Sequence, residues 1–276
     1  MICGRVPGMN RMLELRTRWT LVTGASSGLG EEMARSIARD QGGNVVVVAR
    51  RRERLEALCE ELRSRYGVQA AFIVADLSRP EDVERVFTEA THEREIHGVI
   101  LNAGVAYWGD ALKLDWGEFQ SMLNTNVTSL VRLSTLFARY LVERGNRGGL
   151  MFVSSVAGFI PVPYQAAYSG TKAFVTSYGQ ALTQELRPLG VSVTVFAPGG
   201  ISTEMLDRTG LSNRFKSGDL GVMSAPDCAA HAVRAFIHRK ELYVPGLINQ
   251  TLTFAARLLP RGFLAQRTAA MYRPER

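Results

Sequence analysis

Long hydrophobic runs and closely spaced cysteines are both missing from this sequence of 276 residues. Its apolar stretches, such as residues 45–49 and 72–75, have the length of strands, whereas a membrane-spanning helix needs roughly 20 apolar residues. The three cysteines, Cys3, Cys59 and Cys228, show neither a metal-binding nor a redox spacing. The sequence therefore predicts free thiols in a reducing compartment, with no membrane span and no metal site.

The sequence also has little net charge outside its two ends. Residues 1–18 hold four Arg and one Glu, which gives +3, and residues 247–276 hold five Arg and one Glu, which gives +4. The remaining 228 residues hold 24 basic and 24 acidic side chains. A neutral central part predicts no nucleic-acid partner. The N-terminus carries arginines but no apolar stretch of signal-peptide length, so we expect a cytoplasmic protein.

The pattern that is present alternates strands with helices. Helices are expected at residues 29–43, 52–67, from 80 onward, 115–143 and 164–187. Strand-length apolar runs occur at residues 20–24, 44–49, 69–77, 97–104, 149–155, 191–200 and 241–246. Strands that are apolar throughout and separated by helices predict a parallel sheet covered on both faces. We therefore expect an α/β fold with a single Rossmann-like, doubly wound domain at 17–246, a basic extension at 1–16 and a C-terminal segment at 247–276.

The stretch TLVTGASSGLG, residues 20–30, fits two different motifs. Gly24-Ala25-Ser26-Ser27-Gly28 matches the turn that exposes a hydrolase's nucleophilic serine. A hydrolase would also need an acid and a histidine, for which Asp227 and His231 or His238 can be nominated, but only one strand precedes Ser26. The other interpretation is a dinucleotide loop, in which Gly24 permits the turn, Gly28 lets the backbone approach a pyrophosphate and Gly30 lets the helix pack on the strand.

Four motifs in order favour the dinucleotide interpretation. They are TGASSGLG at 23–30, NAG at 102–104, YSGTK at 168–172 and PGGIST at 198–203. The set resembles the single-domain short-chain dehydrogenase/reductase family, strongly over residues 17–205 and more weakly beyond. The last fifty residues resemble a bacterial subgroup of general oxidoreductases without a defined substrate.

Tyr168 and Lys172 are the candidate catalytic pair, because residues four apart on a helix share a face. A nearby ammonium favours the tyrosinate, so we expect Lys172 to lower the pKa of Tyr168 and make it a general acid or base. Ser155 lies thirteen residues before Tyr168, and the family's spacing selects it over Ser154. The resemblance implies that Asn126 supplies a backbone carbonyl for a water linked to the lysine.

Cofactor choice is indicated at the end of the second strand. NAD-binding folds place an acidic residue there to bind the ribose 2′-hydroxyl, but this sequence has Ala49 followed by three arginines. We expect Arg50 to bind a 2′-phosphate, with Ser26 adding a hydroxyl, so that NADP(H) is the cofactor. Arg51 and Arg52 are expected to begin a solvated helix.

The resemblance implies further cofactor contacts. Lys172 is implied to bind the nicotinamide ribose, beside Tyr168. The other implied contacts are Ser27, Leu29, Asp76, Leu77, Asn102, Ala103, Gly104, Pro198, Gly199, Ile201 and Thr203.

The sequence thus predicts an NADP(H)-dependent oxidoreductase that acts on a carbonyl or alcohol. An NADP(H)-binding regulator with little turnover is the alternative, and a serine hydrolase is a distant one. Residues 203–225 are expected to form a lid over the substrate, opposite residues 158–165. A hydrophobic ketone, a sugar, a quinone or an acyl thioester all remain open as substrates. The resemblance also implies a homodimer or homotetramer.

The C-terminal segment carries apolar side chains with arginines among them, interrupted by Pro260. The interpretation we favour is two short helices that pack on the domain or on a neighbouring subunit. The alternative is peripheral contact with an anionic membrane, where apolar burial and arginines act together.

Overall fold

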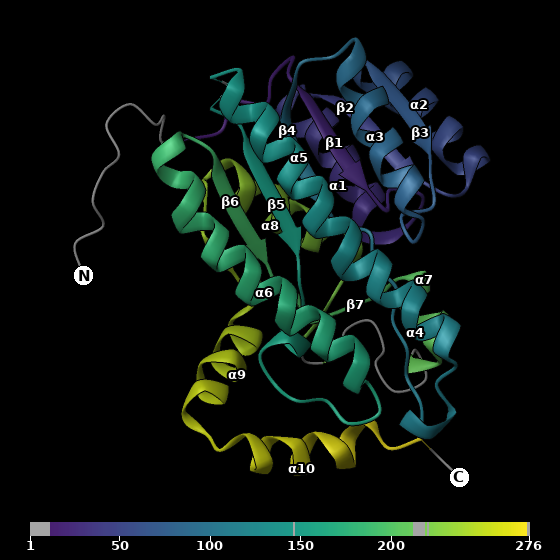
Figure 1. Cartoon of the computed structure of the whole chain (residues 1–276), viewed down its shortest axis with the longest axis vertical. Helices are drawn as coiled ribbons and strands as arrows, with labels where there is room; N and C mark the ends of the chain where they lie inside the picture. Colours follow the sequence, from purple (N-terminus) through teal and green to yellow (C-terminus); the bar gives the residue numbers. More distant parts are fainter. Residues whose placement is uncertain (1–11, 146, 212–218, 220, 275–276) are drawn as a thin grey trace.

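A seven-stranded parallel sheet forms the centre of the computed structural model, which describes residues 12–145, 147–211, 219 and 221–274 (Figure 1). The strand order is β3-β2-β1-β4-β5-β6-β9, and each pair of neighbours is parallel. The strands are β1 (Trp19–Thr23), β2 (Asn44–Ala49), β3 (Ala70–Val74), β4 (Ile96–Leu101), β5 (Gly149–Val153), β6 (Ser192–Phe196) and β9 (Leu242–Tyr243). This is the predicted Rossmann-like, doubly wound α/β fold.

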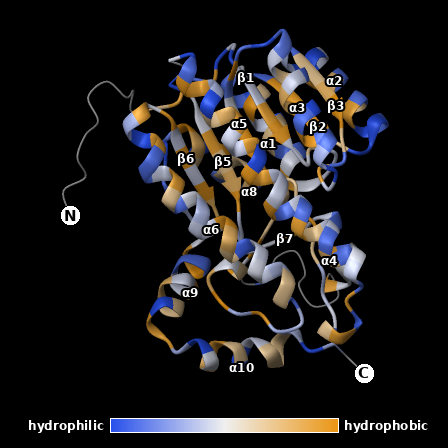
Figure 2. Cartoon of the chain, viewed as in Figure 1, coloured by the Kyte–Doolittle hydropathy of each residue, from blue (hydrophilic) through white to orange (hydrophobic). Residues whose placement is uncertain are grey.

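Both faces of the sheet are covered by helices (Figure 1). The valines of β2 alternate between the two faces: Val45 and Val47 pack into one core cluster, and Val46 and Val48 pack into the other. The strand is apolar throughout because both of its faces are buried. The first cluster includes residues of α1 (Gly28–Gln41), α2 (Arg52–Tyr66) and α8 (Ala225–Ile237). The second includes residues of α3 (Pro80–His92), α5 (Ser129–Glu143) and α6 (Ala166–Leu186). Figure 2 shows hydrophobic strands between helices of mixed character.

The strand order reverses at β1, whose neighbours are β2 on one side and β4 on the other. In a doubly wound sheet, this reversal opens a crevice at the carboxyl ends of the strands, where ligands bind. The Gly-rich loop follows β1, the NAG motif follows β4, Ser155 follows β5 and the PGGIST motif follows β6. The topology therefore brings all four sequence motifs to one edge of the sheet.

The helix predicted at residues 115–143 is not continuous. The structure has α4 (Trp116–Leu123), a π-helical turn η2 (Asn124–Thr128) and then α5. Such a turn accommodates an extra residue and occurs often at functional sites. Here it carries Asn126, which is buried.

The chain beyond β6 forms smaller elements. The paired strands β7 (Gly200–Ile201) and β8 (Val222–Met223) flank α7 (Glu204–Thr209) within the predicted lid, of which residues 212–218 and 220 lie outside the described residues. The chain continues from β9 into α9 (Leu247–Leu258) and α10 (Arg261–Tyr272), and these two helices lie beyond the carboxyl ends of β5 and β6 (Figure 1).

Two further predictions concern the thiols and the ends of the chain. Cys59 and Cys228 are buried and free, as predicted, and burial raises the pKa of each thiol, to about 11 and about 12. Cys3 and residues 1–11 of the basic extension lie outside the described residues. Within the part of the chain that the structure describes, no helix is long and apolar enough to cross a bilayer.

Candidate active site

The Gly-rich loop between β1 and α1 is shaped by close backbone packing. Gly28 has a φ of +59°, which favours glycine, and a Cβ there would lie 2.9 Å from Cγ2 of Thr203. A Cβ on Gly30 would collide with the carbonyl oxygen of Gly24. Ser27 is the N-cap of α1, yet its side chain makes no capping hydrogen bond. The first turn of α1 therefore offers backbone N–H groups and a partial positive charge to an anion.

Thr23 joins this loop to the NAG motif. Its hydroxyl oxygen accepts hydrogen bonds from the backbone N–H groups of Asn102 and Ala103, each at 3.0 Å. In return, the side-chain amide of Asn102 donates to the Thr23 carbonyl at 2.9 Å. Thr23 therefore holds the carboxyl ends of β1 and β4 together. The sequence analysis quoted this threonine as part of the motif but assigned it no role.

Ser155, Tyr168 and Lys172 lie together where β5 ends and α6 begins. Ser155 is the N-cap of the short helix η3 (Val156–Gly158), and its hydroxyl lies close enough to the phenol of Tyr168 to lower the pKa of that phenol. The ammonium nitrogen of Lys172 lies 5.7 Å from the centroid of the Tyr168 ring and donates to the Val153 carbonyl at 2.9 Å. The three side chains predicted to be catalytic thus converge.

Ser154 and Ser155 point to different surroundings. The hydroxyl of Ser154 donates to the Lys172 backbone carbonyl at 2.9 Å and lies 2.6 Å from the hydroxyl of Thr176, both in the core. Of the two serines, it is Ser155 whose hydroxyl lies near enough to the Tyr168 phenol to affect its pKa.

The predicted lowering of the Tyr168 pKa by Lys172 is wrong for the chain by itself. Burial raises the pKa of Tyr168 to about 12; the hydrogen bond with Ser155 opposes this shift, and the phenol of Tyr272 adds to it. Burial likewise lowers the pKa of Lys172 to about 8. Lys172 is buried and Tyr168 is half-buried, and the reduced solvation of each group favours its neutral form.

Asn126 fixes the loop after β4 against α6. Its side-chain oxygen accepts from the backbone N–H of Val105 at 2.9 Å, and its amide donates to the Val105 carbonyl at 2.9 Å and to the Thr171 hydroxyl at 3.0 Å. The Thr171 hydroxyl in turn donates to the Tyr168 carbonyl at 2.7 Å. Asn126 and Thr171 together tie the cofactor loop to the helical turn that carries Tyr168.

The arginines after β2 are arranged differently from the prediction. Arg50 is 57% exposed, and its guanidinium lies 3.9 Å from a carboxylate oxygen of Asp76. Arg51, expected to be solvated, instead donates to the Ser26 hydroxyl at 3.2 Å and to the Ser26 carbonyl at 3.0 Å, and it pairs with Glu204 at 2.9 Å. Because Arg51 is the N-cap of α2, its side chain turns back onto the Gly-rich loop. Arg52 does face solvent, as predicted.

The remaining predicted cofactor residues line the same edge. Asp76 accepts hydrogen bonds from the backbone and hydroxyl of Ser78, while the Leu77 side chain packs into the core. A Cβ on Gly104 would lie 3.4 Å from the Lys172 ammonium, so this glycine leaves space beside the catalytic lysine. Leu29, Pro198, Gly199, Ile201 and Thr203 lie on the loops and short elements after β1 and β6.

The carboxyl end of the chain forms a wall that the sequence analysis missed. The indole N–H of Trp108 donates to the Tyr272 carbonyl at 2.8 Å, and the Thr268 hydroxyl donates to the Pro161 carbonyl at 2.9 Å. A Cβ on Gly210, at the end of α7, would lie 3.5 Å from the Trp108 ring. Helix α10 is therefore tied both to the loop after β4 and to the predicted wall at residues 158–165.

The serine-hydrolase alternative does not fit this arrangement. The Ser26 hydroxyl is bonded to Arg51, and Asp227 is bonded to Ser224 at the N-terminus of α8. The ring of His231 lies 3.0 Å from the Tyr243 hydroxyl. The nominated nucleophile and its partners are thus each engaged with other groups.

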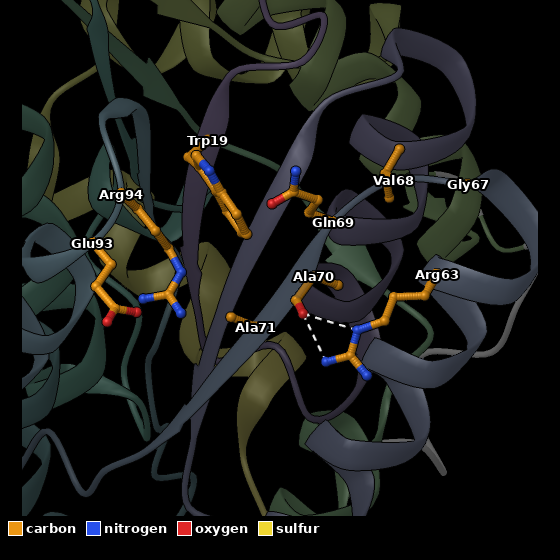
Figure 3. Close-up of a pocket in the computed structure, with 9 residues that line it drawn as sticks. All are labelled: Trp19, Arg63, Gly67, Val68, Gln69, Ala70, Ala71, Glu93 and Arg94. Atoms are coloured by element: carbon orange, nitrogen blue, oxygen red, sulfur yellow. Dashed lines mark hydrogen bonds between the residues drawn. The ribbon is translucent and has the colours of Figure 1, made fainter.

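A separate cavity of 580 Å³ lies away from these residues (Figure 3). Its lining comes from the beginning of β1 and β3 and from the ends of α2 and α3, which is the amino edge of the sheet. The Arg63 guanidinium there donates to the Ala70 carbonyl, and Arg94 lies over the ring of Trp19. None of the four sequence motifs contributes to this cavity.

The comparisons with known proteins agree with the motifs. The family model described as short chain dehydrogenase matches residues 18–213. The 17-beta-hydroxysteroid dehydrogenase type 3 of Rattus norvegicus is 31% identical over 249 residues, which cover 85% of this chain and 79% of that protein.

Solved structures are similar over most of their length. A short-chain dehydrogenase from Sphingobium yanoikuyae in complex with NADPH has a TM-score of 0.79 and 31% identity, covering 94% of this chain and 97% of that one. A bulky-bulky ketone specific alcohol dehydrogenase from Comamonas testosteroni has a TM-score of 0.74 and 28% identity, covering 93% of this chain and 99% of that one.

Proposed function

We propose that this chain, which belongs to the short-chain dehydrogenase family of oxidoreductases, is an NADP(H)-dependent enzyme that interconverts a carbonyl and an alcohol. The observation that carries the proposal is the convergence of Ser155, Tyr168 and Lys172, with Gly104 of the NAG motif beside Lys172. The complete catalytic set also argues against a binding protein with little turnover.

The residues present fit a nicotinamide dinucleotide. Because Ser27 makes no capping hydrogen bond, the N–H groups in the first turn of α1 would hold the pyrophosphate. Ala49 stands where NAD-binding folds carry an acidic residue. The exposed Arg50 that follows it would bind a 2′-phosphate, and Ser26 would add a hydroxyl. Support for NADP(H) also comes from the NADPH complex of the Sphingobium yanoikuyae dehydrogenase. Lys172 would bind the ribose hydroxyls.

The chain's own residues would handle the substrate oxygen and its proton. A bound nicotinamide supplies the hydride that reduces the carbonyl carbon. Ser155 would donate a hydrogen bond to the substrate oxygen, which stabilises the charge that develops there. Tyr168 would give its proton to the same oxygen, because its raised pKa keeps the phenol protonated at neutral pH. Lys172, 5.7 Å from the ring, would stabilise the resulting tyrosinate.

For the substrate we infer a bulky, largely apolar carbonyl compound. Trp108 is bonded to the carbonyl of Tyr272, and Tyr272 is close enough to Tyr168 to affect its pKa, so two aromatic residues lie near the proposed reaction centre. Aromatic surroundings favour apolar ligands of some size. Two similar proteins are named for substrates of this kind, a 17-beta-hydroxysteroid and a bulky-bulky ketone.

A panel of carbonyl compounds tests the proposal. The purified chain is incubated with NADPH and with steroid ketones, diaryl ketones, small aldehydes, sugars and quinones, and loss of nicotinamide absorbance is followed. We expect turnover, with the highest kcat/KM for bulky ketones.

Tyr168→Phe should lower kcat by at least about 100-fold, the lower range for a general acid, while NADPH binding measured by fluorescence stays unchanged.

Two results would contradict the proposal. Absence of turnover across the panel, with tight NADPH binding, would favour the regulatory alternative. Equal rates for Tyr168→Phe and the parent would remove Tyr168 from the mechanism. Tyr66→Phe is a matched control, because Tyr66 is the last residue of α2 and lies outside the four motifs and the expected substrate walls, and it should keep most of the activity.

A further inference from the structure

Helix α9 has its polar and apolar sides reversed relative to a helix that packs on a core. Its buried residues are Asn249 and Thr253, and both are polar. Asn249 is 4% exposed and donates to the carbonyls of Gly221 and Pro245. Among the apolar side chains, Phe254 is 64% exposed and Leu258 is 73% exposed. The helix is thus held to the domain by its polar side and presents its apolar side outward.

The exposed large apolar side chains of α9 lie on one side of the helix. At 3.6 residues per turn, the apolar residues of α9 span an arc of about 160°. The buried Asn249 and Thr253 lie outside this arc, and Arg257 follows them around the helix. Exposed apolar residues continue onto α10 with Phe263 and Met271. We call residues 247–274, which contain α9, Pro260 and α10, the C-terminal arm. Its exposed large apolar residues are Leu247, Ile248, Leu252, Phe254, Leu258, Leu259, Phe263 and Met271.

The arm carries only positive charge. Residues 247–274 contain four arginines and no acidic residue. Arg257, Arg261, Arg267 and Arg273 are all exposed. The Arg267 guanidinium lies 5.1 Å from the centroid of the Phe263 ring, so a basic group accompanies an exposed apolar one. Contiguous exposed apolar surface marks a binding site, and the arginines indicate that its partner is anionic.

We propose that the C-terminal arm docks this chain on the surface of an anionic lipid bilayer. Apolar burial would hold the arc of α9 at the headgroup boundary, and the arginines would add attraction to anionic lipid. A second copy of the chain is a poorer occupant, because two identical arms facing each other would oppose cationic surfaces. The interpretation favoured from the sequence, two short helices that pack on the domain or on a neighbouring subunit, agrees with the polar side of α9 and with the bonds of α10, whereas the apolar side of α9 is exposed.

The docked surface lies on the substrate side of the molecule. Helix α10 is bonded to Pro161 and Trp108, and α9 and α10 lie beyond the carboxyl ends of β5 and β6 (Figures 1 and 2). A docked chain would therefore receive an apolar carbonyl compound from the lipid. This last step rests on the proposed function, whereas lipid binding does not.

Co-sedimentation with vesicles tests the docking without any activity measurement. The full chain is mixed with phosphatidylcholine vesicles with or without phosphatidylglycerol, at low and at high salt. We expect binding only with phosphatidylglycerol at low salt. Phe254→Gln combined with Leu258→Gln should weaken binding by about tenfold or more, because two large apolar side chains lose their burial. Arg257→Gln combined with Arg261→Gln should also weaken it.

Leu189→Gln is the matched control. Leu189 is 56% exposed and lies in the short helix η4 (Arg187–Leu189) after α6, so its replacement should leave lipid binding unchanged. All these variants change exposed side chains, and thermal unfolding should show that each one is folded. No binding at low salt, or equal binding to neutral vesicles, overturns the proposal. A dimer that the Phe254 and Leu258 replacements dissociate would show that a second copy covers the arm.

Discussion

Lys172 places a cation where the fold excludes water. Its side chain is buried, its ammonium donates to the Val153 carbonyl, and burial lowers its pKa from 10.5 to about 8. The folded chain therefore binds this proton less tightly than the unfolded chain does. Below about pH 8 the buried charge costs stability in full, and the cost falls as the pH rises from about 8 toward 10.5.

This linkage gives a prediction for Lys172→Met. The free energy of unfolding of the parent, relative to that of Lys172→Met, should rise by about 2 kcal/mol between about pH 7.5 and about pH 9.5. Denaturant unfolding of both proteins without cofactor measures it, and the comparison cancels the titration of Tyr168 and the thiols. Lys113→Met, at an exposed lysine, should show no such difference. An equal pH dependence in the parent and Lys172→Met would mean that the ammonium is solvated.

The second prediction for a single residue concerns Arg50 and the choice of cofactor. Arg50→Ala should weaken NADPH binding by about 1.5–3 kcal/mol, the value of a hydrogen bond to a charged group, and leave NADH binding nearly unchanged. Arg51→Ala should weaken both cofactors, because it removes the bonds that shape the loop at Ser26. Arg52→Ala, at an exposed arginine, is the control. Fluorescence titration of each variant is the measurement, and equal losses for NADPH and NADH in Arg50→Ala would exclude the 2′-phosphate role.

The local sequence pattern was sufficient to predict those helix ends and strands in which one physical signal dominates. The ends of α1 and α2 were predicted at glycines, and Gly42 and Gly67 do cap them with φ values of +60° and +66°. The buried strands were predicted because apolar runs of that length need two covered faces. Pro260 separates α9 from α10, as the sequence indicated.

Other features depend on contacts between distant residues and had no local signal. The π-helical turn at Asn126 exists because its side chain bonds Val105 and Thr171, and helical periodicity does not reveal one extra residue. The position of Arg51 depends on the approach of β2 to the Gly-rich loop. The raised pKa of Tyr168 depends on burial, whereas the sequence argument considered only the charge of Lys172. Trp108 and Tyr272 lie 164 residues apart along the chain.

At the scale of the molecule, cofactor and substrate sites rest on different parts of the chain. The cofactor loops follow β1, β2 and β4, which belong to the sheet and its two cores. The proposed substrate wall includes α10, which has no buried residue and is joined to the domain by, among other contacts, the hydrogen bonds of Trp108 and Thr268. The fold and cofactor binding should therefore be separable from substrate recognition.

A chain that ends at Pro260 tests this separation, because it loses α10 but keeps Asn249 and its bonds. The loss of two hydrogen bonds at about 0.5–1.5 kcal/mol each should lower the melting temperature by less than about 10 °C. NADPH binding should persist, while the KM for a bulky ketone rises at least tenfold more than that for a small aldehyde, because the wall beside Tyr168 is gone. Thermal unfolding, NADPH titration and steady-state kinetics measure these effects.

Tyr272→Phe is the control and should keep the parent's KM, since the Trp108 bond uses the backbone carbonyl. Loss of NADPH binding in the shortened chain would show that α10 belongs to the folding core.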